Sequence, residues 1–380
     1  MSAAQVLTAA QMRSAEQALF DAGVGVSELM ETAAGGAAEW VRRVAAGRSV
    51  TVLCGPGNNG GDGYVIARRL REAGNAVAVI APLPPKTNAA QQARRRWDGP
   101  VTTAGVAGGD VFVDCLFGSG LSRALVAEHA LLLRDLAARH RYTVAIDLPS
   151  GIASDSGAVF NERMPAYDLT LALGAWKFAH WSLPGREVMG QMRLVPIGIG
   201  KVAGAAQRIT RPRLRAPAVD SHKYRRGLLA IVAGAMPGAS LMSAAAAQRS
   251  GAGYVKLLAS EPDLRTPVEV VTDTAPLAEA LADRRIAAVL IGPGLGRDAA
   301  AKEMLVETLT LAPALVLDAD ALTLLTPAMI GRDVPMLATP HDGELATLCR
   351  RFGIIAEARR DRALALAKLS GTVVLAKGPD

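Results

Sequence analysis

The fold is decided by the stretch Cys54-Gly55-Pro56-Gly57-Asn58-Asn59-Gly60-Gly61-Asp62-Gly63. An apolar run at 50–53 precedes it, and a segment with apolar residues at helical spacing, 63–72, follows it. A strand, a glycine-rich turn and a helix in this order direct backbone N–H groups at a phosphate near the helix N-terminus. The glycine spacing matches neither the dinucleotide-binding fingerprint nor a P-loop. We expect a phosphate-binding turn; the alternative is a polar turn such as any parallel α/β protein contains.

The composition indicates a protein with a large apolar core. The chain has 380 residues, enough for two or three domains, and half of them are apolar. The net charge of +7 comes from scattered arginines, with one short cluster at 94–96, and no basic stripe with interleaved aromatics is present. This pattern excludes a nucleic-acid surface and suits attraction of a small polyanion.

The cysteines and the apolar runs indicate a cytoplasmic protein. The three cysteines are far apart and lack metal-ligand spacing, as expected in a reducing compartment without disulfides. The N-terminus reads as an amphipathic helix rather than a signal peptide, and no apolar run reaches membrane-spanning length. We therefore expect no membrane partner.

Strands and helices alternate along the first part of the chain. After helices at 7–20, with Thr8 as N-cap and Gln11 completing a capping box, and at 27–43, we expect strands at 50–54, 76–81, 111–114, 142–147, 169–173 and 192–196. Helices are expected between them at 63–72, 89–97 and 128–140. Such alternation predicts a parallel sheet with helices on both faces, whose ligand lies beyond the carboxyl ends of the strands.

A second domain follows a Pro- and Arg-containing linker at 208–220, so that the predicted domains are 1–210 and 221–380. In it we expect strands at 228–233, 254–258, 286–291, 314–318, 335–338 and 372–376. Helices are expected at 238–250, 299–309, after 342 and at 361–369. The chain then stops after a core strand, where an α/β domain normally continues, and we expect this domain to be incomplete.

Three strand ends of the first domain carry polar groups. Asp114 leads into the second glycine-rich turn, 116–121, and Asp147 leads into Leu148-Pro149-Ser150-Gly151. A carboxyl group at the end of a buried strand is partly desolvated, which raises its pKa and suits general acid/base work. Each Asp alone could equally cap a turn. The convergence of three such loops favours a functional site, and the oxygen atoms of Asn59, Asp114 and Ser150 could hold a hard cation.

These motifs resemble a known family. Gly55-Pro-Gly-Asn-Asn-Gly-Gly-Asp-Gly63, Asp114-Cys-Leu-Phe-Gly-Ser-Gly120 and Asp147-Leu-Pro-Ser-Gly151 resemble those of NAD(P)H-hydrate epimerases. The second half resembles the ribokinase-like ADP-dependent NAD(P)H-hydrate dehydratases through the motifs His222-Lys-Tyr-Arg-Arg-Gly227, Gly251-Ala-Gly253, Gly292-Pro-Gly-Leu-Gly296, Asp318-Ala-Asp320, Thr339-Pro-His-Asp-Gly-Glu344 and Lys377-Gly378. Together they resemble the bifunctional NAD(P)H-hydrate repair family over nearly the whole chain.

The resemblance implies a fold and two activities. The fold is a Rossmann-like three-layer epimerase domain followed by a ribokinase-like domain. The first domain would interconvert the R and S forms of hydrated NAD(P)H, and the complete second domain would dehydrate the S form at the expense of ADP. The implied partners are these small molecules, with a homo-oligomeric state, and the implied cofactors are K⁺ in the first domain and ADP with Mg²⁺ in the second.

The resemblance also assigns residues. Asp147 would be the acid/base catalyst, and the epimerase substrate would contact Asn58, Asn59, Gly60, Gly61 and Asp62 on its pyrophosphate side and Gly118, Ser119, Gly120, Leu121, Ser122 and Arg123 on its other side. Potassium would bind Asn59, Asp114 and Ser150. In the second domain Ala252, Gly294 and His341 would contact the hydrated nicotinamide, and Lys377 and Gly378 would begin the nucleotide-phosphate loop.

Two departures and several alternatives accompany this assignment. Met30-Glu31-Thr32-Ala33-Ala34-Gly35 replaces the usual Met-Glu-Asn-Ala-Gly on a helix, a minor change. The family's Gly-x-Gly-Asp loop would follow Asp380, so we expect 1–380 alone to epimerise and to dehydrate weakly or not at all. A small-molecule kinase and a non-catalytic dinucleotide-binding scaffold are the alternative functions. Asp318 and Asp320 could organise a strand end or a magnesium-bound phosphate, and His180 and Trp181 are expected at the surface or an interface.

Overall fold

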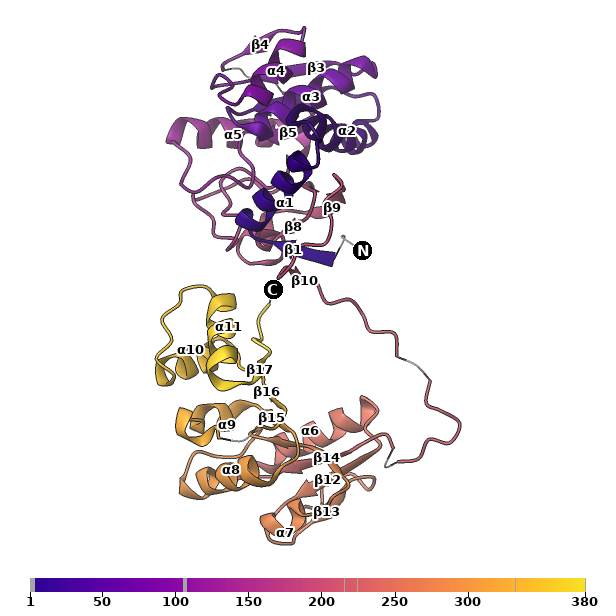
Figure 1. The fold of residues 1–380 in the computed structure, drawn as a ribbon, viewed down its shortest axis with the longest axis vertical. Coiled ribbons are helices and arrows are strands. Elements are labelled where there is room, and N and C mark those ends of the chain that lie inside the picture. Colours follow the sequence, from indigo (N-terminus) through magenta and orange to yellow (C-terminus); the bar gives the residue numbers. More distant parts are fainter. Residues whose placement is uncertain (1–3, 105–107, 215, 224, 332, 380) are drawn as a thin grey trace. The chain divides into compact units, whose positions relative to one another are not determined.

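The computed structural model describes residues 4–104, 108–214, 216–223, 225–331 and 333–379. The chain forms two compact units, Met1–Pro212 and Arg213–Pro379 (Figure 1). Each unit has its own parallel sheet and its own apolar core. The two units are therefore described separately.

The first unit is built on a seven-stranded parallel sheet with the order β4-β3-β2-β5-β6-β7-β9. Its strands are β2 (Val50–Cys54), β3 (Val77–Ile80), β4 (Val101–Thr102), β5 (Gly109–Cys115), β6 (His140–Ile146), β7 (Leu169–Leu173) and β9 (Gln191–Val195). The strand order reverses between β2 and β5, because the chain adds β3 and β4 on one side and β6, β7 and β9 on the other. A parallel α/β sheet binds its ligand at this reversal, beyond the carboxyl ends of the strands.

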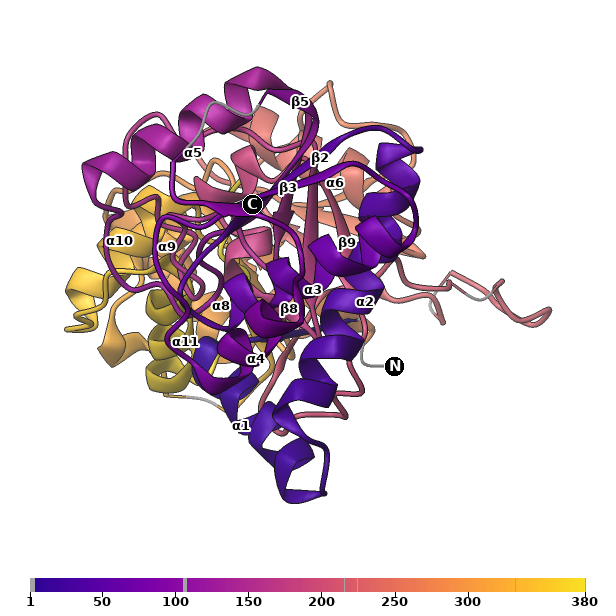
Figure 2. The same cartoon turned by 90° about the horizontal axis from the view of Figure 1, so that it is seen from above.

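Helices cover both faces of this sheet. On one face α2 (Val26–Ala45), α3 (Asn58–Glu72) and α4 (Asn88–Arg96) pack side by side (Figures 1 and 2). On the other face α5 (Ala127–Arg139) packs on β5 and β6. The sheet residues divide accordingly between two apolar clusters, with Val52 and Val113 in one and Leu53 and Phe112 in the other. The expected three-layer α/β arrangement is confirmed.

Helix α1 (Ala9–Asp21) begins as the sequence predicts. The Thr8 hydroxyl accepts a hydrogen bond from the Gln11 N–H at 3.1 Å, and the Gln11 side chain accepts one from the Thr8 N–H at 3.0 Å. A small sheet that the sequence analysis missed lies beside this helix, with the order β10-β1-β8 and strands β1 (Gln5–Leu7), β8 (Trp176–Lys177) and β10 (Ala206–Gln207). Strands of two or three residues carry too little alternation to be recognised in a sequence.

The second unit is a seven-stranded parallel sheet with the order β13-β12-β11-β14-β15-β16-β17. Its strands are β11 (Leu228–Val232), β12 (Tyr254–Leu258), β13 (Val271–Asp273), β14 (Ile286–Ile291), β15 (Leu315–Leu317), β16 (Met336–Ala338) and β17 (Val373–Val374). Its helices are α6 (Pro237–Arg249), α7 (Leu277–Leu281), α8 (Ala299–Leu311), α9 (Ala319–Leu324), α10 (Asp342–Arg351) and α11 (Arg359–Ser370). The predicted α/β fold of the second part of the chain is confirmed. The sequence analysis missed the short elements β13, α7 and α9. Within the described ranges, no helix of either unit combines the length and apolar character of a membrane span.

Candidate functional site

The glycine-rich stretch forms less of a turn than the sequence suggests, because α3 begins at Asn58 rather than at Gly63. Gly57 occupies the N-cap without a side-chain cap, so the first N–H groups of the helix are left for a ligand or water. Two glycines are required by close backbone contact. A Cβ on Gly60 would lie 1.8 Å from the Gly55 carbonyl oxygen, and one on Gly55 would lie 1.6 Å from the Leu116 carbonyl oxygen. The structure thus places a helix N-terminus, free of side-chain bulk, at the reversal of strand order.

Asp147 follows β6 at the same edge of the sheet. Its φ angle is +67°, a left-handed conformation that is uncommon for a residue other than glycine. Its Oδ2 accepts a hydrogen bond from the Ser119 N–H at 3.1 Å, in the second glycine-rich turn. Its Oδ1 accepts one from the Leu173 N–H at 3.4 Å and forms a close ion pair with Lys177 Nζ. The carboxylate is therefore buried, paired and fixed in direction.

The ion pair decides the charge of Asp147. Burial alone raises the pKa of this carboxyl, but the Lys177 ammonium and the N–H of Ser119 outweigh burial and bring the pKa below its ordinary value. The sequence-based expectation of a raised pKa is therefore wrong for Asp147. It left out Lys177, which is 30 residues away in the chain. Asp147 is an ionised base at neutral pH.

His180 joins the same cluster, and the expectation that it lies at the surface is wrong, since its side chain is fully buried. Its Nδ1 accepts a hydrogen bond from the Lys177 N–H at 2.9 Å, so Nε2 carries the proton and donates it to the Asp147 carbonyl oxygen at 2.9 Å. Burial and the Lys177 ammonium lower the pKa of His180 to about 4. His180 is thus a neutral structural donor, while Trp181 is half-buried and packs edge-on against Trp176.

Two further carboxyl groups interact electrostatically with Asp147, and their pKa values shift in the opposite direction. Burial, followed by the charges of Asp147 and Glu16, raises the pKa of Asp62 on α3 well above its ordinary value. Burial and the Asp147 charge also raise the pKa of Glu16 on α1, against the pull of Lys177. The pKa of Asp147 is thus lowered while those of Asp62 and Glu16 are raised, and opposite shifts of neighbouring carboxyl groups are typical of sites that use one group as base and another as acid.

The raised pKa of Asp62 predicts a pH-dependent stability. An Asp whose pKa is higher in the folded than in the unfolded state stabilises the fold only while protonated, so the first unit loses stability as the pH rises from about 4 through the folded-state pKa. Asp62→Asn removes this titration and is expected to make the unit more resistant to urea than the wild type at about pH 8, with a smaller difference at about pH 5.

Tryptophan fluorescence measures this effect in the correct unit, because all four tryptophans, Trp40, Trp97, Trp176 and Trp181, lie in the first one. The exposed Asp135 on α5 provides the control, since Asp135→Asn alters no buried charge. Equal pH dependence of the Asp62→Asn protein and the wild type would contradict a raised pKa of Asp62.

Asp114 and Ser150 are brought together directly, as expected, and Asn59 is not bonded to either. Asp114 Oδ1 accepts hydrogen bonds from the Leu116 N–H at 3.0 Å and the Ser150 hydroxyl at 2.7 Å. Its Oδ2 accepts from the Ser150 N–H at 2.9 Å and the Tyr167 hydroxyl at 2.6 Å. Burial raises the pKa of Asp114 in spite of these four donors. The predicted rise in pKa is confirmed here.

The Asn59 amide lacks hydrogen-bond partners for both its oxygen and its nitrogen among the described residues, although both atoms are buried. It lies beside the second glycine-rich turn and Asp147. A Cβ on Gly118 would be 3.1 Å from Asn59 Cγ and 3.3 Å from Asp147 Oδ2. The rest of that predicted set (Gly118–Arg123) lines a partly exposed rim, with Gly120, Ser122 and Arg123 exposed. A buried amide without protein partners is available to a ligand, an ion or a water molecule.

Lys177 and Glu16 are the charged residues around Asp147 that the sequence analysis missed. Lys177 did leave a signal, because it and His180 are the two titratable side chains in the otherwise largely apolar run 169–181. A lysine inside a run that must be buried needs a partner. Glu16 left none, since it reads as an ordinary polar position of an amphipathic helix.

The second unit gathers a separate group of predicted residues. Gly294, with φ +69°, follows β14, and its Cβ would lie 2.4 Å from the Met236 carbonyl oxygen. His341 follows β16 and caps α10 by accepting a hydrogen bond from the Gly343 N–H at 3.0 Å. His341 also forms a β-bridge with Lys377, which precedes Gly378. Ala252, in contrast, precedes β12 and lies at the opposite edge of the parallel sheet, so the structure does not bring it beside Gly294 and His341.

Asp318 and Asp320 are both engaged with cations at this edge. Asp318 Oδ1 accepts a hydrogen bond from Lys377 Nζ at 2.6 Å. Asp320 accepts from Arg297 Nε at 2.7 Å and from the Gly296 N–H at 3.1 Å. These contacts favour a role in organising the strand ends. Tyr224, which belongs to the motif His222–Gly227, lies outside the described residues.

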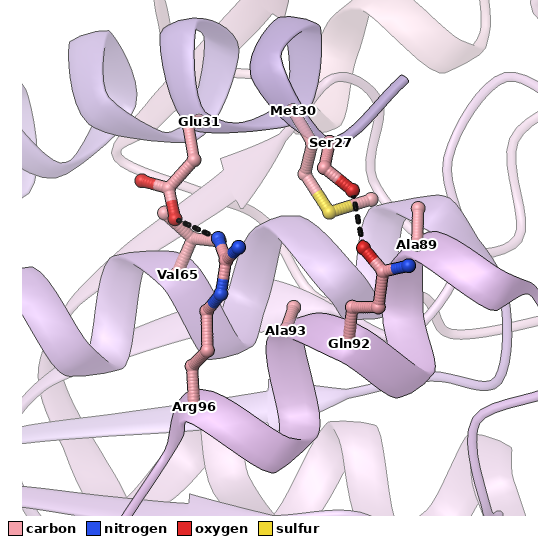
Figure 3. Close-up of a pocket in the computed structure, with 8 residues that line it drawn as sticks. All are labelled: Ser27, Met30, Glu31, Val65, Ala89, Gln92, Ala93 and Arg96. Atoms are coloured by element: carbon pink, nitrogen blue, oxygen red, sulfur yellow. Dashed lines mark hydrogen bonds and ion pairs between the residues drawn. The ribbon is translucent and has the colours of Figure 1, made fainter. Parts of the chain in front are cut away.

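A hollow between α2, α3 and α4 is too small to compete with these sites. It is lined by Ser27, Met30, Glu31, Val65, Ala89, Gln92, Ala93 and Arg96 (Figure 3). Its volume is about 10 Å³, room for a single water. The Ser27 hydroxyl donates to Gln92 Oε1 at 2.6 Å, and Arg96 pairs with Glu31 at 3.4 Å, so its polar groups are already satisfied.

Comparison with known proteins identifies both units. The family described as YjeF-related protein N-terminus matches residues 26–179, and the family described as NAD(P)H-hydrate dehydratase matches residues 229–380. The bifunctional NAD(P)H-hydrate repair enzyme Nnr of Gloeobacter violaceus is 35% identical over 97% of this chain and 80% of its own length. The enzyme of the same name from Synechocystis is 33% identical over 90% of this chain and 72% of its own.

A solved structure resembles part of the chain more distantly. The ADP/ATP-dependent NAD(P)H-hydrate dehydratase of Bacillus subtilis is 28% identical, with a TM-score of 0.37 over 43% of this chain and 62% of its own. That likeness is too weak to support a conclusion by itself. The identity and coverage of the full-length relatives are sufficient: the chain belongs to the family of bifunctional NAD(P)H-hydrate repair enzymes.

Proposed function

We propose that this protein acts in the repair of hydrated NAD(P)H, with the first unit interconverting the R and S hydrates and the complete dehydratase domain dehydrating the S form with ADP. The observation that carries the first activity is Asp147, an ionised, buried carboxylate beside an open helix N-terminus. Inversion at the hydrated ring carbon requires a bond to open and to close again on the other face. A proton must be removed from the hydroxyl group or returned to it in both steps, which is work for a fixed base.

The contacts of Asp147 leave one oxygen for this proton. Oδ1 is occupied by Lys177 and Leu173, whereas Oδ2 accepts one hydrogen bond, from the Ser119 N–H. We assign Oδ2 as the proton acceptor. The first turn of α3 (Asn58–Asp62) would hold the pyrophosphate with its N–H groups, and the rim Gly118–Arg123 would line the other side of the dinucleotide.

A monovalent cation fits the first unit in part. The unpartnered Asn59 amide oxygen calls for a ligand, and Asp114 and Ser150 supply further oxygen atoms, although Asp114 already accepts four hydrogen bonds. Across the described ranges no three His, Cys, Asp or Glu side chains form a metal-binding group. We propose that K⁺ binds at Asn59, Asp114 and Ser150, where it would fix the two glycine-rich turns.

Exchange of potassium for tetramethylammonium is expected to raise the KM for the hydrate and to lower the melting temperature of the first unit. A weakly hydrated ion of defined size suits an all-oxygen site, which a bulky organic cation cannot enter. Titration with KCl at constant ionic strength, followed by tryptophan fluorescence, measures the stabilisation. Asn59→Ala should abolish that response. A melting temperature and KM that do not depend on the cation would show that no such site exists.

For the second unit we propose that Gly294 and His341 contact the hydrated nicotinamide and that Lys377 and Gly378 contact the nucleotide phosphates. Lys377 and His341 are already joined by a β-bridge, which supports one shared site. Ala252 stays a proposal from family resemblance alone. Mg²⁺ would enter with the ADP phosphates, because Asp318 and Asp320 are occupied by Lys377 and Arg297.

Location and assembly are proposed on the sequence. All three cysteines are free and buried, which fits the reducing environment of the cytoplasm. A homo-oligomer is expected from the family resemblance, and light scattering of the purified protein measures it directly.

The two activities are tested together by incubating separated hydrate epimers with the protein, with and without ADP, and following each epimer by chromatography. Interconversion without ADP supports the epimerase. Formation of NAD(P)H with ADP supports the dehydratase. An epimer that stays unchanged beyond its spontaneous rate would reject the function proposed for the first unit.

A further inference from the structure

We propose that Lys177 is the positioning residue of the epimerase: its ammonium group holds Asp147 by Oδ1 and thereby leaves Oδ2 directed at the substrate. This inference rests on the proposed epimerase function and adds a residue that neither the sequence motifs nor the family comparison assign. Lys177 acts through Asp147 and need not touch the substrate.

Lys177 has the geometry of a residue built into the site. Its side chain is 1% exposed. Nζ pairs with Asp147 Oδ1 and donates a hydrogen bond to the Leu173 carbonyl oxygen at 2.7 Å. An ammonium group is buried only when its partners repay the loss of water, and a partner removed from such a pair leaves an uncompensated charge. A change at Lys177 or at Asp147 therefore affects the energy of both charged groups.

The small three-stranded sheet explains how Lys177 reaches Asp147. Strand β8 pairs in parallel with β1, in the register Val6 with Trp176 and Leu7 with Lys177. The other edge of β1 pairs with β10, so the lysine backbone is held on a sheet rather than on a free loop. The small three-stranded sheet thus fixes Lys177, which is the one cation that contacts Asp147 in the described part of the chain.

His180 strengthens this arrangement at the backbone. It receives the Lys177 N–H on Nδ1 and donates its Nε2 proton to the Asp147 carbonyl oxygen. The same imidazole therefore ties the lysine to the aspartate through their main chains. A backbone at φ +67° persists only where its surroundings determine it, and this double contact supplies that constraint.

The charged and titratable groups around Asp147 make the effect of Lys177 measurable. Asp62 faces it from α3 and Glu16 from α1, both with raised pKa values, and His180 faces it as a neutral ring. Without the Lys177 ammonium, burial would raise the pKa of Asp147. The base would then be ionised only at higher pH.

Lys177→Met tests this by removing the charge while keeping an unbranched side chain. We expect kcat at about pH 7 to fall roughly 10- to 100-fold, with KM changed less than about threefold. The acidic limb of the kcat profile should move upward by at least about one pH unit, which corresponds to a tenfold change in the ionised fraction. Activity should therefore recover in part at alkaline pH. The exposed Lys201 gives the control, and Lys201→Met should leave the profile unchanged.

Two controls show whether the variant is folded and whether a negative result rejects this inference or the proposed epimerase function. Tryptophan fluorescence shows whether the first unit of the Lys177→Met protein is folded. If it is not, Lys177→Arg, which keeps a cation, decides: an acidic limb at the wild-type position supports the proposal, and a limb moved upward overturns it. A folded Lys177→Met protein with an unmoved limb and kcat within twofold of wild type would also overturn it. If Asp147→Asn is inactive in that case, the epimerase assignment stands and this inference alone fails. If Asp147→Asn is fully active, the assignment of the base is itself wrong.

Discussion

Asp147→Asn is expected to lower epimerase turnover by roughly two to four decades, the usual contribution of one acid/base group. The change keeps the size of the side chain and removes its charge and its ability to take a proton from the hydrate. KM should change little, because we propose that the first turn of α3, and not this carboxylate, holds the pyrophosphate. Assays that start from one purified epimer, stopped at intervals and resolved by chromatography, give kcat and KM.

This prediction has a control and a clear contrary result. Asp135→Asn on the exposed face of α5 should have wild-type turnover. The loss of charge also leaves Lys177 buried without its carboxylate, so tryptophan fluorescence must show that the first unit is folded. A folded Asp147→Asn protein with near-normal turnover would remove Asp147 from the mechanism.

Gly60→Ala is expected to destabilise the first unit by about 3 kcal/mol or more, because a methyl group has no room at that position. Its Cβ would lie 1.8 Å from the Gly55 carbonyl oxygen, and backbone cannot yield as a flexible side chain does. Either the turn or the start of α3 must shift, and epimerase activity should be lost with it. Urea unfolding followed by tryptophan fluorescence measures the change in this unit.

Gly57→Ala is the matched control on the same turn. No atom lies within 4 Å of a Cβ at Gly57, and its φ of −95° is open to any residue. The control should cost less than about 1 kcal/mol, the effect of a poorer N-cap. Similar losses for both variants would show that the turn does not depend on the close approach at Gly60.

The sequence predicts the strands that carry the site better than it predicts the pKa shifts of the carboxyl groups in it. Strands β2, β12 and β14 were placed at their observed residues, because their β-branched and leucine-rich runs are bounded by polar turns. Asn59, Asp114 and Asp147 lie at or just beyond the carboxyl ends of β2, β5 and β6, three strands that the sequence also predicts. What sequence reasoning could not supply were interactions between distant segments, such as the ion pair of Lys177 with Asp147 and the electrostatic effect of Glu16 on Asp62. These interactions lower the pKa of Asp147 and raise the pKa values of Asp62 and Glu16.

The start of α3 shows a second limit of the sequence. A run with glycines at positions 55, 57, 60, 61 and 63 reads as a loop, since glycine disfavours helix, yet the helix begins at Asn58. Close packing against Gly55, Cys54 and Cys115 overrides the local preference, because only residues without a Cβ fit there. Helix propensity is a weak guide where tertiary contacts decide.

The most direct test of the account follows one pure epimer of hydrated NADH with the wild-type protein and with the Asp147→Asn protein, without ADP. The account predicts that the wild type brings the epimer to the equilibrium mixture much faster than the spontaneous reaction. The folded Asp147→Asn protein should do so at least about a hundredfold more slowly than the wild type. Equal rates for the two proteins, or a wild-type rate no faster than the spontaneous one, would contradict an Asp147-dependent epimerase in the first unit.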